Sequence, residues 1–80
     1  MTLQEKFNQA RQNMQHLFKS ALGFRTSFAN STTIKTEIYI NDTIIAVGFA
    51  GGSDYPLNER CLLSMLNAIA NYDLNLIPKE

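Results

Sequence analysis

Two side chains could act as a base and a nucleophile: His16 and Cys61, the only histidine and the only cysteine of the chain. An imidazole titrates near neutrality, and a thiolate is a strong nucleophile when such a base activates it. However, His16 falls beside the apolar stripe of a predicted helix, and Cys61 precedes Leu62 and Leu63, which is typical of a buried, unreactive thiol. No third group that would orient the pair is apparent. We therefore predict no catalytic residues and a protein that is not an enzyme.

Three glycines and two carboxylates could suggest a phosphate or cation site. Gly48, Gly51 and Gly52 match neither the dinucleotide fingerprint nor the Walker pattern, and no lysine follows them. A connection from a strand to a helix explains these glycines, and capping of that helix explains Asp54 and Glu59. One cysteine with one histidine cannot form a structural zinc site. We expect no cofactor-binding residues, no cofactor and no metal.

The composition is that of one small globular domain spanning residues 1–80. Hydrophobic residues make up 45% of the chain and charged residues 18%, which excludes a disordered class. No apolar run approaches the roughly 20 residues that would cross a bilayer, so we expect no membrane partner. The polar N-terminus lacks a signal segment, and a lone cysteine suits a reducing compartment, so a cytoplasmic location is predicted.

The charges are unevenly distributed along the chain. Seven basic residues balance seven acidic ones overall, but residues 1–36 carry a formal net charge of +4 and residues 37–80 carry −4. If the fold keeps the basic half on one side, nucleic acid or an acidic partner could meet it there. Ordinary solvated charge is the alternative. This basic side would consist of Lys6, Arg11, Lys19, Arg25 and Lys35.

Two segments show the period of a helix. Residues 2–22 begin with the capping-box spacing of Thr2 and Glu5. Their apolar residues then recur at steps of three and four, namely Leu3, Phe7, Ala10, Met14, Leu17 and Ala21. Residues 55–72 form a second helix whose apolar arc is wide, so this helix should be largely buried, with Leu66 and Ile69 in the core. The tail at 73–80 could be a short edge strand or a docked segment.

The segment between the helices predicts three strands. Residues 33–41 and 43–50 alternate like a hairpin, with Asn41 and Asp42 as its two-residue turn. That turn sets one face of pairs as Ile40–Thr43, Ile38–Ile45, Thr36–Val47 and Ile34–Phe49. The other face then holds Tyr39 opposite Ile44, followed by Ala46 and Gly48. A further strand at 24–29 would pair Phe28 with Ile34, Phe24 with Ile38 and Arg25 with Glu37.

The predicted fold class is therefore α+β, in the order α-β-β-β-α. Both helices should cover one face of a three-stranded antiparallel meander, because only one face of the sheet is apolar. This order is similar to that of the double-stranded-RNA-binding domain, most clearly from Thr33 to Tyr72. The resemblance implies nucleic-acid binding as one possible function. That family places lysines at the start of its last helix, whereas residues 54–59 of this chain include two acids and no base.

Protein binding is the leading functional hypothesis, and nucleic-acid binding through the basic side is the alternative. Small, cofactor-free domains that act by steric occlusion include inhibitors, antitoxins and anti-CRISPR proteins of phages or mobile elements. The predicted contact residues on the sheet are Tyr39, Ile44 and Ala46. Leu3 and Phe7 should project beyond the sheet edge, where a symmetric homodimer would bury them. The absence of disulfide or metal staples in so short a chain also favours a homodimer.

Overall fold

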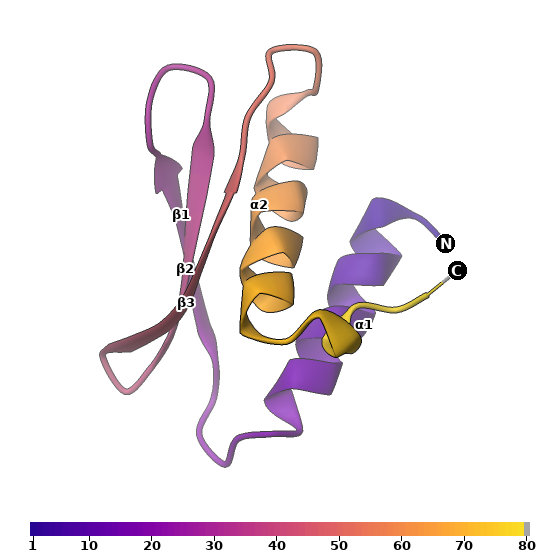
Figure 1. Ribbon diagram of the computed structural model, residues 1–80, viewed down its shortest axis with the longest axis vertical. Helices are drawn as coiled ribbons and strands as arrows, with labels where there is room; N and C mark the ends of the chain where they lie inside the picture. Colours follow the sequence, from indigo (N-terminus) through magenta and orange to yellow (C-terminus); the bar gives the residue numbers. More distant parts are fainter. Residues whose placement is uncertain (80) are drawn as a thin grey trace.

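The computed structural model describes residues 1–79 and has the predicted α-β-β-β-α order. In chain order the elements are α1 (Leu3–Gln15), β1 (Gly23–Phe28), β2 (Ile34–Ile40), β3 (Thr43–Ala50), α2 (Leu57–Tyr72) and the 3-10 turn η1 (Leu74–Leu76). The strands form an antiparallel sheet in the order β1-β2-β3. Both helices lie on one side of it, with α2 against β2 and β3 and α1 against α2 (Figure 1). Glu80, the last residue of the predicted tail, lies outside the described residues.

The first helix is shorter than the predicted 2–22, because it ends at Gln15. The Gln15 side chain takes over the hydrogen bonds that a continuing helix would have made. Its Oε1 accepts from the Leu22 backbone N–H at 2.9 Å, and its Nε2 donates to the Ser20 carbonyl at 2.9 Å. A side-chain amide therefore competes with the backbone ladder and turns the chain toward the sheet. The predicted capping box of Thr2 and Glu5 is present.

The hairpin turn is confirmed, but the predicted register beyond it is wrong by one residue. Asn41 and Asp42 both have positive φ, at 48° and 68°, as a two-residue hairpin turn requires. The pairs Ile40–Thr43 and Tyr39–Ile44 are present. A β-bulge between Ile38 and Tyr39 then shifts the remaining pairs, which become Ile38–Ala46, Thr36–Gly48 and Ile34–Ala50. Because one extra residue reverses the faces of a strand, β3 points different side chains at the helices than predicted.

The bulge places the smallest residues of β3 beneath α2. Gly48 faces the helix so closely that an added Cβ would lie 2.1 Å from the backbone nitrogen of Ala68. Val47 or Phe49 at this point would push the helix away from the sheet, which explains why the shifted register is preferred. The contact is completed by buried hydroxyls, since Thr36 Oγ1 lies 2.6 Å from Ser64 Oγ.

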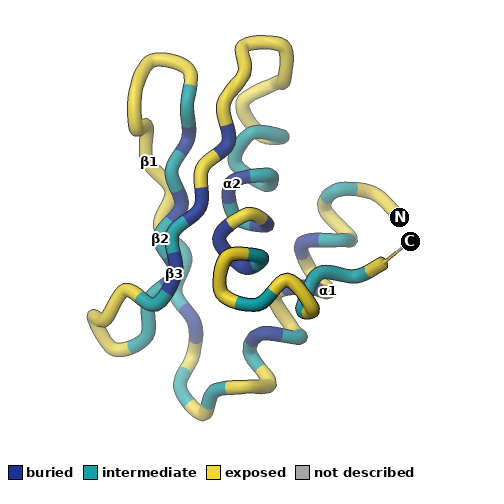
Figure 2. Tube along the Cα trace, in the orientation of Figure 1, coloured by how far each residue is buried: buried dark blue, intermediate teal, exposed yellow. Residues whose placement is uncertain are grey.

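The predicted first strand and the predicted core residues Leu66 and Ile69 are confirmed. The first strand, predicted at 24–29, pairs Phe24 with Ile38, Arg25 with Glu37 and Phe28 with Ile34. Buried side chains from all the main elements except β1 meet in one cluster: Phe7, Ala10, Met14, Leu22, Ile38, Ala46, Leu66, Ala68 and Ile69. Figure 2 colours the buried residues of the chain dark blue. The second helix ends at Tyr72, as predicted, but it begins at Leu57 rather than at residue 55. Its N-cap is Pro56, so the predicted capping by Asp54 is wrong. The tail is docked rather than a strand, because Asn13 Nδ2 donates to the Leu76 carbonyl at 2.9 Å.

Candidate protein-binding face

The sheet surface opposite the helices is the main candidate site, and we call it the outer face. Its apolar side chains are Tyr39 on β2 and Ile44, Val47 and Phe49 on β3. Phe49 is 51% exposed and Ile44 is 48% exposed. Both helices lie on the opposite side, so no element among residues 1–79 covers this surface (Figure 1). Side chains of this kind, left uncovered along one strand, are typical of a protein contact surface.

Charged residues flank this apolar row and hold its aromatic ring in place. Glu37 lies between two cations, with its carboxylate 3.4 Å from Arg25 Nε and 3.7 Å from Lys35 Nζ. The Arg25 guanidinium also lies 5.6 Å from the centre of the Tyr39 ring, within the range of a cation–π interaction. That ring crosses Gly23, where an added Cβ would be 2.3 Å from Tyr39 Cζ. The Tyr39 ring is therefore held between the Arg25 guanidinium and the Gly23 backbone, which leaves it little conformational freedom.

The structure brings together only part of the predicted partner-binding set. Tyr39 and Ile44 are paired on the outer face, as predicted. The placement of Ala46 on that face is wrong, because the bulge turns Ala46 into the core. Phe7 does not project beyond the sheet, since it is 8% exposed and packs edge-on against Phe24 at 5.6 Å. Leu3 is half-buried and packs against the core from α1.

Sequence reasoning missed Val47 and Phe49, which occupy the outer face in place of Ala46 and Gly48. One signal was available in the sequence. The small residues Ala46, Gly48 and Ala50 alternate along the strand, and an alternating row of small side chains suits a face that a helix approaches closely. The predicted register followed the isoleucines of β2 instead, because a register without a bulge pairs them with the larger apolar residues of β3.

The predicted basic side is divided between the two sides of the molecule. Arg25 and Lys35 lie on the outer face, where they share Glu37. Arg11 is on the exposed surface of α1, where it lines a shallow polar hollow with Asn8 and Gln12, and Lys19 is exposed in the turn after this helix. Lys6 is half-buried beside the apolar residues of α2. The five cations thus form no continuous track for a nucleic-acid backbone.

The residues considered for catalysis lie on separate elements. His16 is exposed at the end of α1, whereas Cys61 is half-buried on α2 and lines an apolar hollow beside β1. Among residues 1–79, no three His, Cys, Asp or Glu side chains are grouped closely enough to hold a metal ion. Over the same residues, every helix is too short or too polar to cross a membrane.

Comparison with known proteins identifies no relative. No protein-family model matches the chain, and neither the curated proteins nor the solved structures include a significant match.

Proposed function

We propose that this protein is a small non-enzymatic binding protein that blocks another protein by covering part of its surface. The observation that supports this proposal is the uncovered outer face, where Ile44, Val47 and Phe49 form an apolar row beside the anchored Tyr39. A central apolar patch with a rigid aromatic residue and a charged rim is the usual anatomy of a protein interface.

Steric occlusion is the mechanism that such a surface allows. The sheet is held from behind by α2, so the face presents a fixed shape rather than a loop that folds on binding. A partner that docks there loses access to the same area of its own surface. Inhibitors of the antitoxin or anti-CRISPR kind, carried by phages or mobile elements, are the class that this size and mechanism suggest.

Affinity capture with matched variants tests the proposal. The tagged protein is incubated with a native lysate, and the retained proteins are identified by mass spectrometry. Phe49→Ser should abolish retention of the specific partner, because it removes the most exposed apolar side chain of the outer face, at 51% exposure. Leu74→Ser is the matched control, since Leu74 is 71% exposed on the helix side of the molecule, and it should retain the same partner.

Two results would argue against the proposal. If Leu74→Ser abolished capture and Phe49→Ser left it intact, the binding surface would lie on the helix side of the molecule instead. Retention on heparin that falls steeply with salt, and that depends on Arg11 and Lys19, would favour the nucleic-acid alternative.

A further inference from the structure

The two edge strands of the sheet differ in how the rest of the molecule protects their outward backbone groups. Along β3, the amide of Asn67 donates to the Phe49 carbonyl at 2.7 Å, and the amide of Asn71 donates to the Val47 carbonyl at 2.8 Å. Side chains of α2 thus occupy the outward carbonyls of this edge strand, and the bulge distorts it further. These are devices that prevent an edge strand from pairing with another chain.

The opposite edge, β1, has no such protection. Residues 25–28 of this strand are all exposed, as its yellow upper half in Figure 2 shows. No proline interrupts the strand, its pairing with β2 contains no bulge, and its one charged side chain, Arg25, is paired with Glu37 of β2 on the outer face. Phe28 is the most prominent residue, with 61% of its surface exposed. An edge of this kind is open to pairing with a further strand.

The hydrogen-bonding groups that β1 offers follow from the alternation of an antiparallel sheet. Because the Val47 carbonyl points away from β2, the paired residue Glu37 must direct its backbone groups toward β1 and bond with Arg25. The bond from the Ala29 N–H to the Thr33 carbonyl, at 2.8 Å, continues the same alternation. The outward N–H and C=O groups are therefore those of Phe24, Thr26 and Phe28.

We propose that β1 pairs with β1 of a second copy, antiparallel and symmetric about Thr26. The strand is nearly palindromic, because its Phe-Arg-Thr-Ser-Phe sequence has an aromatic residue two positions on either side of Thr26. In this register Thr26 bonds with Thr26 of the second copy, and Phe24 bonds with Phe28. All the outward groups of both strands then find partners across the two-fold axis.

Side chains on both faces fit this register. On the outer face, Arg25 lies opposite Ser27 of the second copy. If the two-fold axis lay at Arg25 instead, the two Arg25 side chains would lie directly opposite each other, and their like charges would repel. On the helix side, the exposed Phe28 meets Phe24 of the second copy, which already packs on Phe7. Aromatic pairs across strands are favourable at this spacing.

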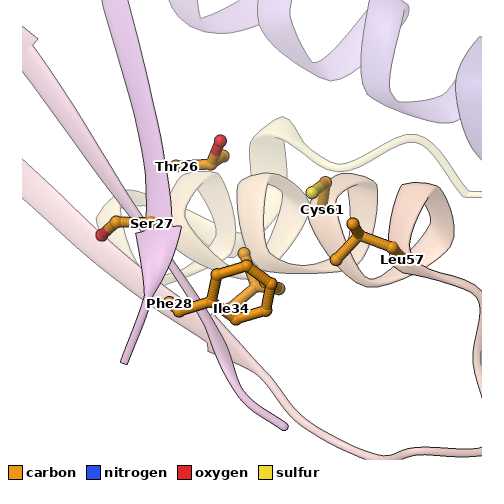
Figure 3. A pocket seen from close by; sticks show the side chains of 6 residues that line it. All are labelled: Thr26, Ser27, Phe28, Ile34, Leu57 and Cys61. Carbon is orange, nitrogen blue, oxygen red and sulfur yellow. The ribbon is translucent and has the colours of Figure 1, made fainter. Parts of the chain in front are cut away.

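An apolar hollow beside β1 would be covered by the same contact. Its volume is about 130 Å³, and Figure 3 shows Thr26, Phe28 and Ile34 from the sheet facing Leu57 and Cys61 from α2 across it. Leu57 is 48% exposed here. The dimer would form one six-stranded sheet and unite the two outer faces into a single surface. The edge geometry of β1 supports this dimer whether or not the outer face binds another protein.

Sedimentation equilibrium across a concentration series tests the dimer. The unmodified protein should approach twice the 9.0 kDa chain mass with rising concentration. Thr26→Pro removes an outward N–H while leaving the bonds between β1 and β2 intact, so it should weaken dimerisation by about tenfold or more. Thr26→Ala is the matched control, because it keeps this N–H and should still form dimers.

A second pair of variants keeps the proposal falsifiable if Thr26→Pro does not fold. Phe28→Lys places a charge on the open edge and should leave only monomer, whereas Phe49→Lys changes a similarly exposed phenylalanine on the outer face and should not. Amide exchange gives a third measurement: the N–H groups of Phe24, Thr26 and Phe28 should become protected as the concentration rises. A monomer at every concentration, or a dimer that both Thr26→Pro and Phe28→Lys preserve, would overturn the proposal.

Discussion

At the scale of single residues, Gly48 decides how closely α2 approaches the sheet. An added Cβ at this position would meet backbone atoms of α2, at 2.1 Å for the Ala68 nitrogen and 2.6 Å for the Ser64 carbonyl oxygen. We therefore predict that Gly48→Ala lowers the free energy of unfolding by about 3 kcal/mol, at the upper end of the usual cost of overpacking. Denaturant unfolding would measure this change.

Gly51→Ala is the matched control for that measurement. The nearest atom to its added Cβ would be the Thr33 hydroxyl oxygen at 3.0 Å, which belongs to a side chain and can shift. We expect a change below about 1 kcal/mol. Equal costs at the two glycines would show that the contact between α2 and β3 is looser than the structure indicates.

The Glu5 carboxyl makes the stability of the α1 N-terminus depend on pH. Thr2 donates to this carboxylate from its backbone N–H, at 2.8 Å, and this hydrogen bond is the main cause that lowers the pKa of Glu5. A lowered folded-state pKa means that the stabilisation is complete above the ordinary glutamate pKa and is lost as the pH falls through the folded value. The free energy of unfolding of Glu5→Gln should therefore differ most from that of the unmodified protein at neutral pH.

Unfolding curves between neutral and acidic pH would check this expectation. The two proteins differ at residue 5 alone, so effects common to both cancel in the difference. The difference in the free energy of unfolding should shrink as the solution becomes more acidic than the ordinary pKa of a glutamate, about 4.3. A difference that grows on acidification would contradict the capping role of Glu5.

At the scale of elements, the hairpin turn uses positive φ at residues that adopt it with some strain. Asp42 has a φ of 68°, and glycine is the residue preferred at this second position of the turn. Asp42→Gly should stabilise the protein by about 0.5 kcal/mol, whereas Asp42→Ala should destabilise it by about 1 kcal/mol. Thermal unfolding of the two variants would measure both signs, and a more stable alanine variant would contradict the assigned turn.

Element types were predictable from the sequence, whereas one boundary and one register were not. The periods of the two helices and the turn at Asn41 are local signals, and the structure confirms them. The early end of α1 depends on Gln15 reaching the backbone of Leu22, seven residues away, which no periodicity reveals. The bulge depends on the space beneath α2, a tertiary property of Gly48. Half of the outer face, Val47 and Phe49, was missed for that reason.

At the scale of the whole molecule, one core joins the helices to the sheet. Buried residues from α1, β2, β3 and α2 belong to the same cluster, and Ile69 lies fully buried within it. A single cluster in a domain of this size should unfold cooperatively, so far-UV circular dichroism and tyrosine fluorescence should report coincident transitions. Tyr72 is a suitable probe, because its ring packs against Phe18 at 5.7 Å and so reports on the contact between the first and last parts of the chain.

Ile69→Ala measures how much this core contributes. Truncation of a fully buried isoleucine leaves a cavity and should cost about 2–5 kcal/mol, a large share of the stability of about 5–15 kcal/mol that is usual for a single domain. Leu74→Ala removes a comparable side chain that is 71% exposed and should change the free energy of unfolding by about 0.5 kcal/mol or less. Because the core spans both layers, the loss in Ile69→Ala should move both spectroscopic transitions together. Separate transitions would mean that α1 folds on the rest of the molecule as an independent unit.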